Sequence, residues 1–325
     1  MPRNIGWQIG AGAAIVAAMV AALVPMAQAQ DYPNKPVRLV VGFGAGGTMD
    51  VYARMLAKNV QERSKIAIII DNRPGAGGML AASQVQQSPA DGYTILHIAP
   101  STISKVMLKD PPFDVYKALQ PIAPFWLGPF VFATSVSTPV ATAKEFVELA
   151  KANPGKFNYG ATNAVHALPM IAFMSIAGIK MQQVEYKLSP QMNQALATNE
   201  IQASFGTLQS VQPQLSGGKL KVLMVTGNQR LAALPNVPTT TESGFPNLQP
   251  HVIGAILSPL GMPAPVASKL SAAIRDAVSS PEVEKLLVGN GGKPLAVSNE
   301  EFARLLQDEE AMWASLAKIA GFKPQ

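Results

Sequence analysis

Short apolar runs alternate with segments of helical periodicity along the first third of the chain. Residues 37–43 (VRLVVGF) and 66–70 (IAIII) are continuous apolar runs, the pattern of strands buried on both faces, and residues 93–98 are predicted to form a third strand. A glycine cluster follows each of the first two runs, and helical spacing begins at Thr48 and again at residues 81–87. Strands that alternate with helices predict an α/β fold with a parallel sheet covered by helices on both faces.

Predicted strands and helices continue to alternate beyond residue 122. Residues 123–133 and 253–257 are apolar and are predicted to be strands that cross between two domains. Between these segments we expect a second α/β unit, and after them a helical tail. The expected elements of the second unit alternate between helix and strand, starting with a helix and ending on two strands, at residues 143–152, 157–160, 167–177, 182–186, 192–197, 201–205 and 222–226.

The last helix is predicted from its two ends. Ser298 and Glu301 have the spacing of a capping box, in which the two side chains bind backbone N–H groups at the start of a helix, and Gly321 suits the end. One face of this helix is apolar and consists of Phe302, Leu305, Leu306, Met312, Leu316 and Ile319.

Composition narrows the possible functions. The 325 residues suffice for two domains, at roughly 150 residues per domain. The absence of cysteine excludes disulfide frameworks, cysteine-ligated zinc, iron–sulfur clusters and a thiol nucleophile. His97, His166 and His251 lie too far apart for a zinc-binding HExxH helix, so no metal is expected. Lys plus Arg exceeds Asp plus Glu by 26 − 20 = 6 without a basic run, so no nucleic-acid partner is expected.

The first 29 residues have the three parts of a secretory signal peptide. Arg3 is basic, residues 9–24 are apolar, and Ala27-Gln28-Ala29 places small residues where a signal peptidase cleaves. We therefore expect cleavage after Ala29 and a periplasmic protein. The alternative is an uncleaved membrane anchor, but 16 residues are short for a bilayer core of about 30 Å.

Two glycine-rich loops are the candidate ligand-binding elements of the first unit. Residues 42–47 (GFGAGG) contain G-x-G-x-x-G between a strand and a helix, and Asp71 lies at the end of the next strand, as in dinucleotide-binding folds. Export argues against a nicotinamide cofactor, so no cofactor is expected. The same loops, the second at residues 75–78, suit a smaller anion because glycines let backbone N–H groups approach it closely. The alternative is that the glycines only make tight turns.

Seven segments carry a family resemblance that runs from residue 32 nearly to the end of the chain. They are YPNKPVRLVVGFGAGGTMDVYAR, DNRPGAGGMLAA, DGYTIL, KANPGKFNYG, VEYK, SGGKLKVLMVTGNQRLAALPNVPT and SPLGMPAP. In this order they resemble the substrate-binding proteins of tripartite tricarboxylate transporters, the Bug-type periplasmic receptors. The resemblance implies a two-domain, type II-like periplasmic-binding-protein fold, with two crossing strands at the hinge, that closes like a flytrap on a small carboxylate. Its domains would comprise residues 30–128 plus 254–325, and residues 129–253.

The resemblance also implies a binding site shared by both domains. The first domain would supply backbone donors and hydroxyls from Phe43, Gly44, Ala45, Gly46, Gly47, Thr48, Asp50, Gly75, Ala76, Gly77, Gly78, Ser101 and Thr102. The second domain would supply Thr162, Asn163, Ala164, His166, Tyr186, Phe205, Gly206 and Thr207. Asp50 equally suits the first turn of a helix, where an acid is favourable. Trp126 and Phe130 are interpreted as packing at the hinge.

The chain also departs from the family pattern. The first glycine loop lacks two prolines that are usual there, and the loop before His166 is about two residues shorter. Gly206 replaces a usual acidic residue, and Ile253-Gly254 replaces a usual aromatic pair. These departures leave the identity of the carboxylate open.

The expected function is that of a monomeric receptor that passes a carboxylate to the membrane subunits of a tripartite tricarboxylate transporter. A receptor that reports the ligand to a membrane sensor without transport is one alternative. A secreted enzyme is another, although the chain contains no G-x-S-x-G, HExxH or P-loop signature and no catalytic residue is predicted.

Overall fold

The computed structural model describes residues 32–324, so the predicted signal peptide lies outside the described residues. One compact unit begins at Lys35. Within the described residues, no helix has both the length and the hydropathy that are needed to cross a membrane.

A six-stranded sheet forms the centre of the first lobe, the name used here for this sheet and the helices that cover it. The strand order is β11-β4-β10-β3-β1-β2. The expected parallel pairing is confirmed for β2-β1-β3, whereas β10 runs antiparallel to both β3 and β4. The strands are β1 (Val37–Val41), β2 (Ile68–Asn72), β3 (Thr94–Ile98), β4 (Leu119–Pro129), β10 (His251–Pro259) and β11 (Lys293–Pro294).

The prediction that residues 66–70 form a strand buried on both faces is wrong. The strand begins at Ile68, and it lies at the edge of the sheet, where Ile69 is 58% exposed. An apolar run of this length is compatible with either position, because burial at an edge depends on which helices cover it.

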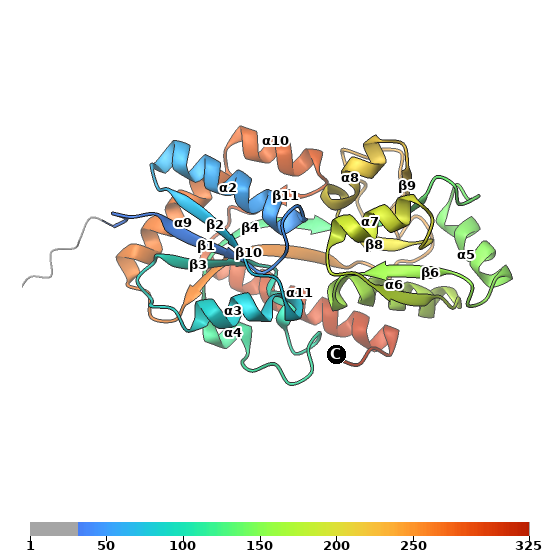
Figure 1. The fold of residues 1–325 in the computed structure, drawn as a ribbon, viewed down its shortest axis with the longest axis horizontal. Coiled ribbons are helices and arrows are strands. Elements are labelled where there is room, and N and C mark those ends of the chain that lie inside the picture. The colour runs from blue at the N-terminus through green and yellow to red at the C-terminus, as the bar shows by residue number, and fades with distance from the viewer. Residues whose placement is uncertain (1–31, 325) are drawn as a thin grey trace, which may run out of the picture. The chain divides into compact units, whose positions relative to one another are not determined.

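Helices cover both faces of this sheet (Figure 1). One group packs α2 against α9 and α10, and the other group, α3 and α11, shares a core cluster with β1, β3 and β10. Successive side chains of β1 point to opposite faces of the sheet, so Val40 packs in that cluster and Leu39 does not. The helices are α2 (Thr48–Ser64), α3 (Met79–Gln86), α4 (Val115–Ala118), α9 (Ala264–Val278), α10 (Pro281–Gly289) and α11 (Asn299–Ala320).

The second lobe, the name used here for β5 to β9 with α5 to α8, contains two smaller sheets. One is antiparallel with the order β8-β5-β9, and the other pairs β6 with β7 in parallel. The ring of Phe132 packs 5.0 Å from the rings of Phe146 and Phe173 and 5.1 Å from that of Phe205, which forms the aromatic core. The elements are β5 (Val131–Ser135), α5 (Ala143–Ala152), β6 (Asn158–Ala161), α6 (Ala164–Ala177), β7 (Gln182–Glu185), α7 (Ser189–Ala197), β8 (Ser204–Gly206), α8 (Leu208–Ser216) and β9 (Leu220–Val225).

Three helices of the second lobe differ from the prediction. Helix α7 begins at Ser189, three residues before the predicted start. Helix α6 begins at Ala164, three residues before the predicted start, because the Asn163 side chain accepts the His166 N–H and caps the helix. Helix α8 was not predicted. It begins after Thr207, whose hydroxyl accepts the Ser210 N–H, and the Pro213 inside it weakened the helical pattern.

The chain crosses between the lobes twice. Strand β4 leads to β5 with only Phe130 between them, and β10 returns the chain to the six-stranded sheet. The two crossings are joined by hydrogen bonds, because the Phe130 N–H donates to Thr226 Oγ1 (2.8 Å) and the Thr226 hydroxyl donates to the Pro250 carbonyl (2.6 Å). Helix α11 also packs on α6, where the Ser175 hydroxyl donates to the Ile319 carbonyl (3.1 Å).

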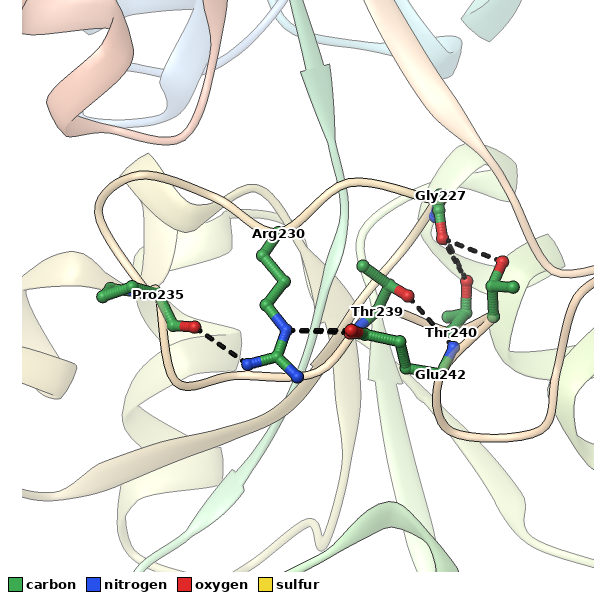
Figure 2. A network of polar contacts seen from close by, with 7 residues as sticks. Gly227, Arg230, Pro235, Thr239, Thr240 and Glu242 are labelled. Carbon is green, nitrogen blue, oxygen red and sulfur yellow. Dashed lines mark hydrogen bonds and ion pairs between the residues drawn. The ribbon is translucent and has the colours of Figure 1, made fainter.

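A polar network orders the proline-rich loop that precedes β10 (Figure 2). Arg230 Nε lies 2.9 Å from Glu242 Oε2, and the same carboxylate oxygen accepts the Thr239 N–H at 2.8 Å. The Thr240 hydroxyl donates to the Leu248 carbonyl at 2.7 Å. The Arg230 guanidinium holds the pKa of the Glu242 carboxyl below its usual value.

Both predicted ends of the last helix are confirmed. Ser298 Oγ accepts the Glu301 N–H (3.2 Å), and Gly321 adopts the left-handed conformation (φ 58°) that ends the helix. Of the predicted apolar face, Phe302, Leu306 and Leu316 are buried, and the buried stripe also contains Glu309 and Trp313, which the apolar pattern did not single out.

Candidate ligand-binding cleft

A cavity of about 630 Å³ lies between the two lobes, and residues of both lobes line it. On the side of the first lobe the lining comes from loops that follow β1, β2 and β3. Because β2-β1-β3 are parallel, their carboxyl ends lie at one edge of the sheet, where open α/β sheets bind ligands.

The first glycine loop connects β1 to α2. Gly46 has a φ of +79°, and its N–H donates to Asp50 Oδ2 at 3.0 Å, so the loop is closed by a carboxylate in the first turn of the helix. Arg54 Nη2 lies 2.9 Å from Asp50 Oδ1. Burial raises the pKa of Asp50, but the hydrogen bonds from Arg54, Gly46 and Asn72 outweigh burial and leave the pKa below its usual value. Asp50 therefore stabilises the loop through the Gly46 N–H and does not itself line the cavity.

The second glycine loop lies directly against the first. A Cβ added to Gly42 would be 3.1 Å from the Gly78 Cα, and one added to Gly78 would be 2.8 Å from Ile98 Cδ1. Gly77 and Gly78 also have φ values of 62° and 105°. Position 78 therefore requires glycine for two reasons: the backbone has a positive φ there, and Ile98 leaves no space for a Cβ.

The loop after β3 presents one of its two predicted hydroxyl residues to the cavity. Thr102 lines the cavity, whereas the Ser101 hydroxyl donates to Oε1 of the buried Glu309 at 3.3 Å. The Ile253 N–H donates to the same oxygen at 2.9 Å. Burial raises the pKa of the Glu309 carboxyl to about 8 against these two hydrogen bonds.

The wall of the second lobe is built around the start of α6. Thr162 Oγ1 and His166 Nδ1 lie 2.6 Å apart and share a hydrogen bond. The His166 ring also meets Phe130 edge to face at 6.0 Å between centroids. Burial lowers the pKa of His166 to about 4, so this imidazole is neutral at pH 7.

Two contacts join the lobes beside the cavity. Thr48 Oγ1 of the first loop lies 2.6 Å from Thr207 Oγ1 and shares a hydrogen bond with it. Nearby, the Leu188 side chain packs closely over Gly44, so a side chain at position 44 would require Leu188 to shift. The glycine at position 44 therefore makes room for the second lobe.

We expect the pair Thr48 and Thr207 to be energetically coupled. In a double-mutant cycle of Thr48→Val and Thr207→Val, the double variant should lose less unfolding free energy than the sum of the two single variants. The difference should be about 0.5–1.5 kcal/mol, the typical net contribution of one hydrogen bond. Urea unfolding of the four proteins measures this coupling. Because Thr207 also caps α8, the cycle is needed to separate that role from the contact with Thr48. Strict additivity would show that the lobes do not meet here in solution.

Most of the predicted site residues line the cavity. They are Phe43, Gly44, Gly47, Thr48, Gly75, Ala76, Gly77, Gly78, Thr102, Thr162, Asn163, Ala164, His166, Tyr186 and Thr207.

Six predicted residues do not line it. Ala45, Gly46, Asp50, Ser101, Phe205 and Gly206 lie elsewhere. Ala45 and Gly46 face solvent, Asp50 and Ser101 bind neighbouring groups behind their loops, and Phe205 belongs to the aromatic core of the second lobe. These placements share one reason, since a loop or strand end exposes only some of its positions on the side of the cavity.

The apolar part of the wall was not predicted from the sequence. Trp126, Phe130 and Val252 line the cavity from the crossing segments, and Met107 and Leu188 line it from the two lobes. Trp126 and Phe130 are buried in the first crossing segment, with 1% exposure each, and they also line the cavity. The signal available in the sequence was their place in a crossing strand, since such strands lie where two domains meet.

Comparisons with known proteins agree with this geometry. The profile of the family described as "Tripartite tricarboxylate transporter family receptor" matches residues 52–322. A UPF0065 protein of Bordetella pertussis is 35% identical over 304 residues, which cover 92% of this chain and 94% of that protein.

Two solved structures are similar throughout. One, described as R. palustris Rpa4515 with adipate, is 28% identical with a TM-score of 0.87, over 91% of this chain and 100% of that chain. The other, the periplasmic binding protein BugD, is 26% identical with a TM-score of 0.84, over 90% of this chain and 100% of that chain. The fold is therefore the two-domain α/β fold of periplasmic binding proteins.

Proposed function

Because this chain belongs to the tripartite tricarboxylate transporter receptor family, whose members are periplasmic solute-binding proteins, we propose that it captures a small carboxylate in the cleft. The observation that carries the proposal is the pair of glycine loops at the carboxyl ends of β1 and β2, both on the wall of the cavity. Backbone N–H groups that are left free at such loops and at the start of a helix attract anions. The adipate bound by the similar protein Rpa4515 supports a carboxylate as that anion.

We also propose the further steps that this assignment implies. The chain is exported, closes two domains with boundaries near residues 128 and 254 over the ligand, and delivers it to the membrane subunits of a tripartite tricarboxylate transporter. The two hydrogen-bonded crossings at Phe130 and Pro250 support a hinge at this place, because hinges concentrate their dihedral changes in a few residues.

Thermal unfolding of the purified protein with a panel of mono-, di- and tricarboxylates tests the proposal. An acid at 100 times its dissociation constant should stabilise the native state by about 2.7 kcal/mol, and the corresponding amide should have no effect. Nicotinamide dinucleotides should leave the melting temperature unchanged. A clear shift with NAD, or equal shifts with an acid and its amide, would contradict carboxylate binding at the glycine loops.

A further inference from the structure

The cavity wall contains very little charge. Among the described residues that line it, the charged ones are Glu185 and Lys187, which have opposite signs, lie two positions apart and are both exposed. His166 also lines the wall, and burial keeps its imidazole neutral at pH 7. No buried cation of the described wall is therefore available to pair with a negative charge on the ligand.

The part of the wall beside the crossings is apolar. Trp126, Phe130 and Val252 are only 1%, 1% and 3% exposed, and Met107 is fully buried. Leu108, which is partly buried, extends this surface from the loop after β3. A ligand held at the glycine loops would meet this surface with the rest of its body.

Trp126 occupies its place because position 254 is glycine. In the sheet Trp126 is opposite Gly254, and the indole lies so close that any Cβ at 254 would collide with it. The indole also packs edge to face on Tyr52, with ring centroids 5.0 Å apart. Gly254 thus leaves room for a large aromatic side chain against β10, where it forms part of the apolar wall.

These two properties favour a particular kind of acid. A second carboxylate placed against the apolar wall would lose its hydration without a cation to replace it, which is unfavourable, whereas an uncharged body gains from leaving water there. On the second lobe, the starts of α6 and α7 both line the cavity and are the other anchors for an anion. The Asn163 side chain already accepts the His166 N–H in the first turn of α6, and Pro190 removes one N–H donor from the first turn of α7.

We propose that the cleft selects carboxylates that carry a single charge and an uncharged, mainly apolar body over dicarboxylates of the same length. This inference rests on the proposed function and deepens it, because it names the class of carboxylate. It assigns the glycine loops to the one charge and Trp126, Phe130, Met107 and Val252 to the body.

Isothermal titration calorimetry at pH 7 with three six-carbon compounds tests the inference. Hexanoate has one carboxylate and an apolar end, adipate has a carboxylate at both ends, and hexanamide has none. We expect hexanoate to bind at least about tenfold more tightly than adipate, and hexanamide to give no binding heat. Adipate binding as tightly as hexanoate, or more tightly, would overturn the inference and leave the proposed function standing. Absence of binding by both acids would overturn the inference, because hexanoate has the single charge and the apolar body that the inference requires. Equal binding of hexanamide and hexanoate would overturn both.

A charge introduced into the apolar wall provides the converse test. In Leu108→Arg, a guanidinium becomes available to the far carboxylate, so the preference for hexanoate over adipate should fall by at least about tenfold. The matched control is Leu260→Arg, which adds the same charge at a residue that is 55% exposed and outside the cavity wall, and it should keep the wild-type preference. An unchanged preference in folded Leu108→Arg would contradict the assignment of this wall to the ligand body, and if that variant does not fold, the wild-type titrations decide alone.

Discussion

Gly47→Val should abolish the stabilisation by carboxylates while the protein still folds and unfolds cooperatively. Gly47 lines the cavity at the start of α2, where a carboxylate would approach the backbone N–H groups. Its φ of −80° and ψ of 169° are allowed for any residue, and a Cβ there would be 3.5 Å from the Gly44 carbonyl oxygen, an ordinary contact. The valine side chain is thus accommodated by the loop but occupies space next to the anion.

The expected loss is the whole ligand effect, about 2.7 kcal/mol at 100 times the wild-type dissociation constant. Thermal unfolding with and without the best acid of the panel measures it. Gly289→Val is the matched control, because Gly289 is exposed at the end of α10 with nothing within 4 Å of an added Cβ. This control should keep the acid response. A full response in Gly47→Val would show that the anion does not bind at this loop.

Gly78→Val should behave differently, because the φ of 105° at Gly78 disfavours any L side chain and Ile98 occupies the space for a Cβ. That substitution would therefore disturb the fold itself, which is why Gly47 is the informative position.

Glu309→Gln should stabilise the protein increasingly as the pH rises from 5 to 8. The Glu309 carboxyl is fully buried, and burial raises its pKa to about 8 from a usual value of 4.5. Between pH 4.5 and pH 8 this carboxyl has lost its proton in the unfolded chain but keeps it in the folded protein. The free energy of unfolding of the wild type therefore falls as the pH rises through this range. Glutamine keeps an oxygen for the Ile253 N–H and the Ser101 hydroxyl, which both bind Oε1, and it does not titrate.

The magnitude follows from linkage. Each pH unit in this window changes the unfolding free energy by up to about 1.4 kcal/mol, so the difference between the variant and the wild type should grow by an amount on the order of 3 kcal/mol. Urea unfolding at pH 5, 6, 7 and 8 measures it. The variant must be compared with the wild type at each pH, because two histidines also change the stability of both proteins. Burial lowers the pKa of His97 to about 3 and of His166 to about 4, so both groups raise the free energy of unfolding as the pH rises toward 6.5.

The matched control is Glu310→Gln, which removes the neighbouring carboxyl on the same helix, where the side chain is only partly buried. It should follow the pH dependence of the wild type. If both variants follow the wild type, Glu309 is ionised in the folded protein over the whole range and its burial does not control stability.

Much of the first lobe could be predicted because its signals are local. An apolar run, a glycine cluster and a helical pattern occur in order within residues 37–64, and the structure has β1, the loop and α2 in that order. The capping residues of α11 were found in the same way, since a cap depends on residues three or four positions apart. Helix α8 escaped prediction because a proline interrupts its weak pattern, and its cap at Thr207 was interpreted only as a binding residue.

The sequence by itself determined the fold class, the family and the glycine loops, since runs, turns and motifs are properties of neighbouring residues. Only the tertiary structure decided which residues share the cavity wall. Thr48 and Thr207 meet across 159 positions of sequence, Ser101 turns to Glu309 and away from the cavity, and Trp126 lies over Gly254. Each of these contacts depends on strand register and on how the two crossings place one lobe against the other, and no local pattern encodes that geometry.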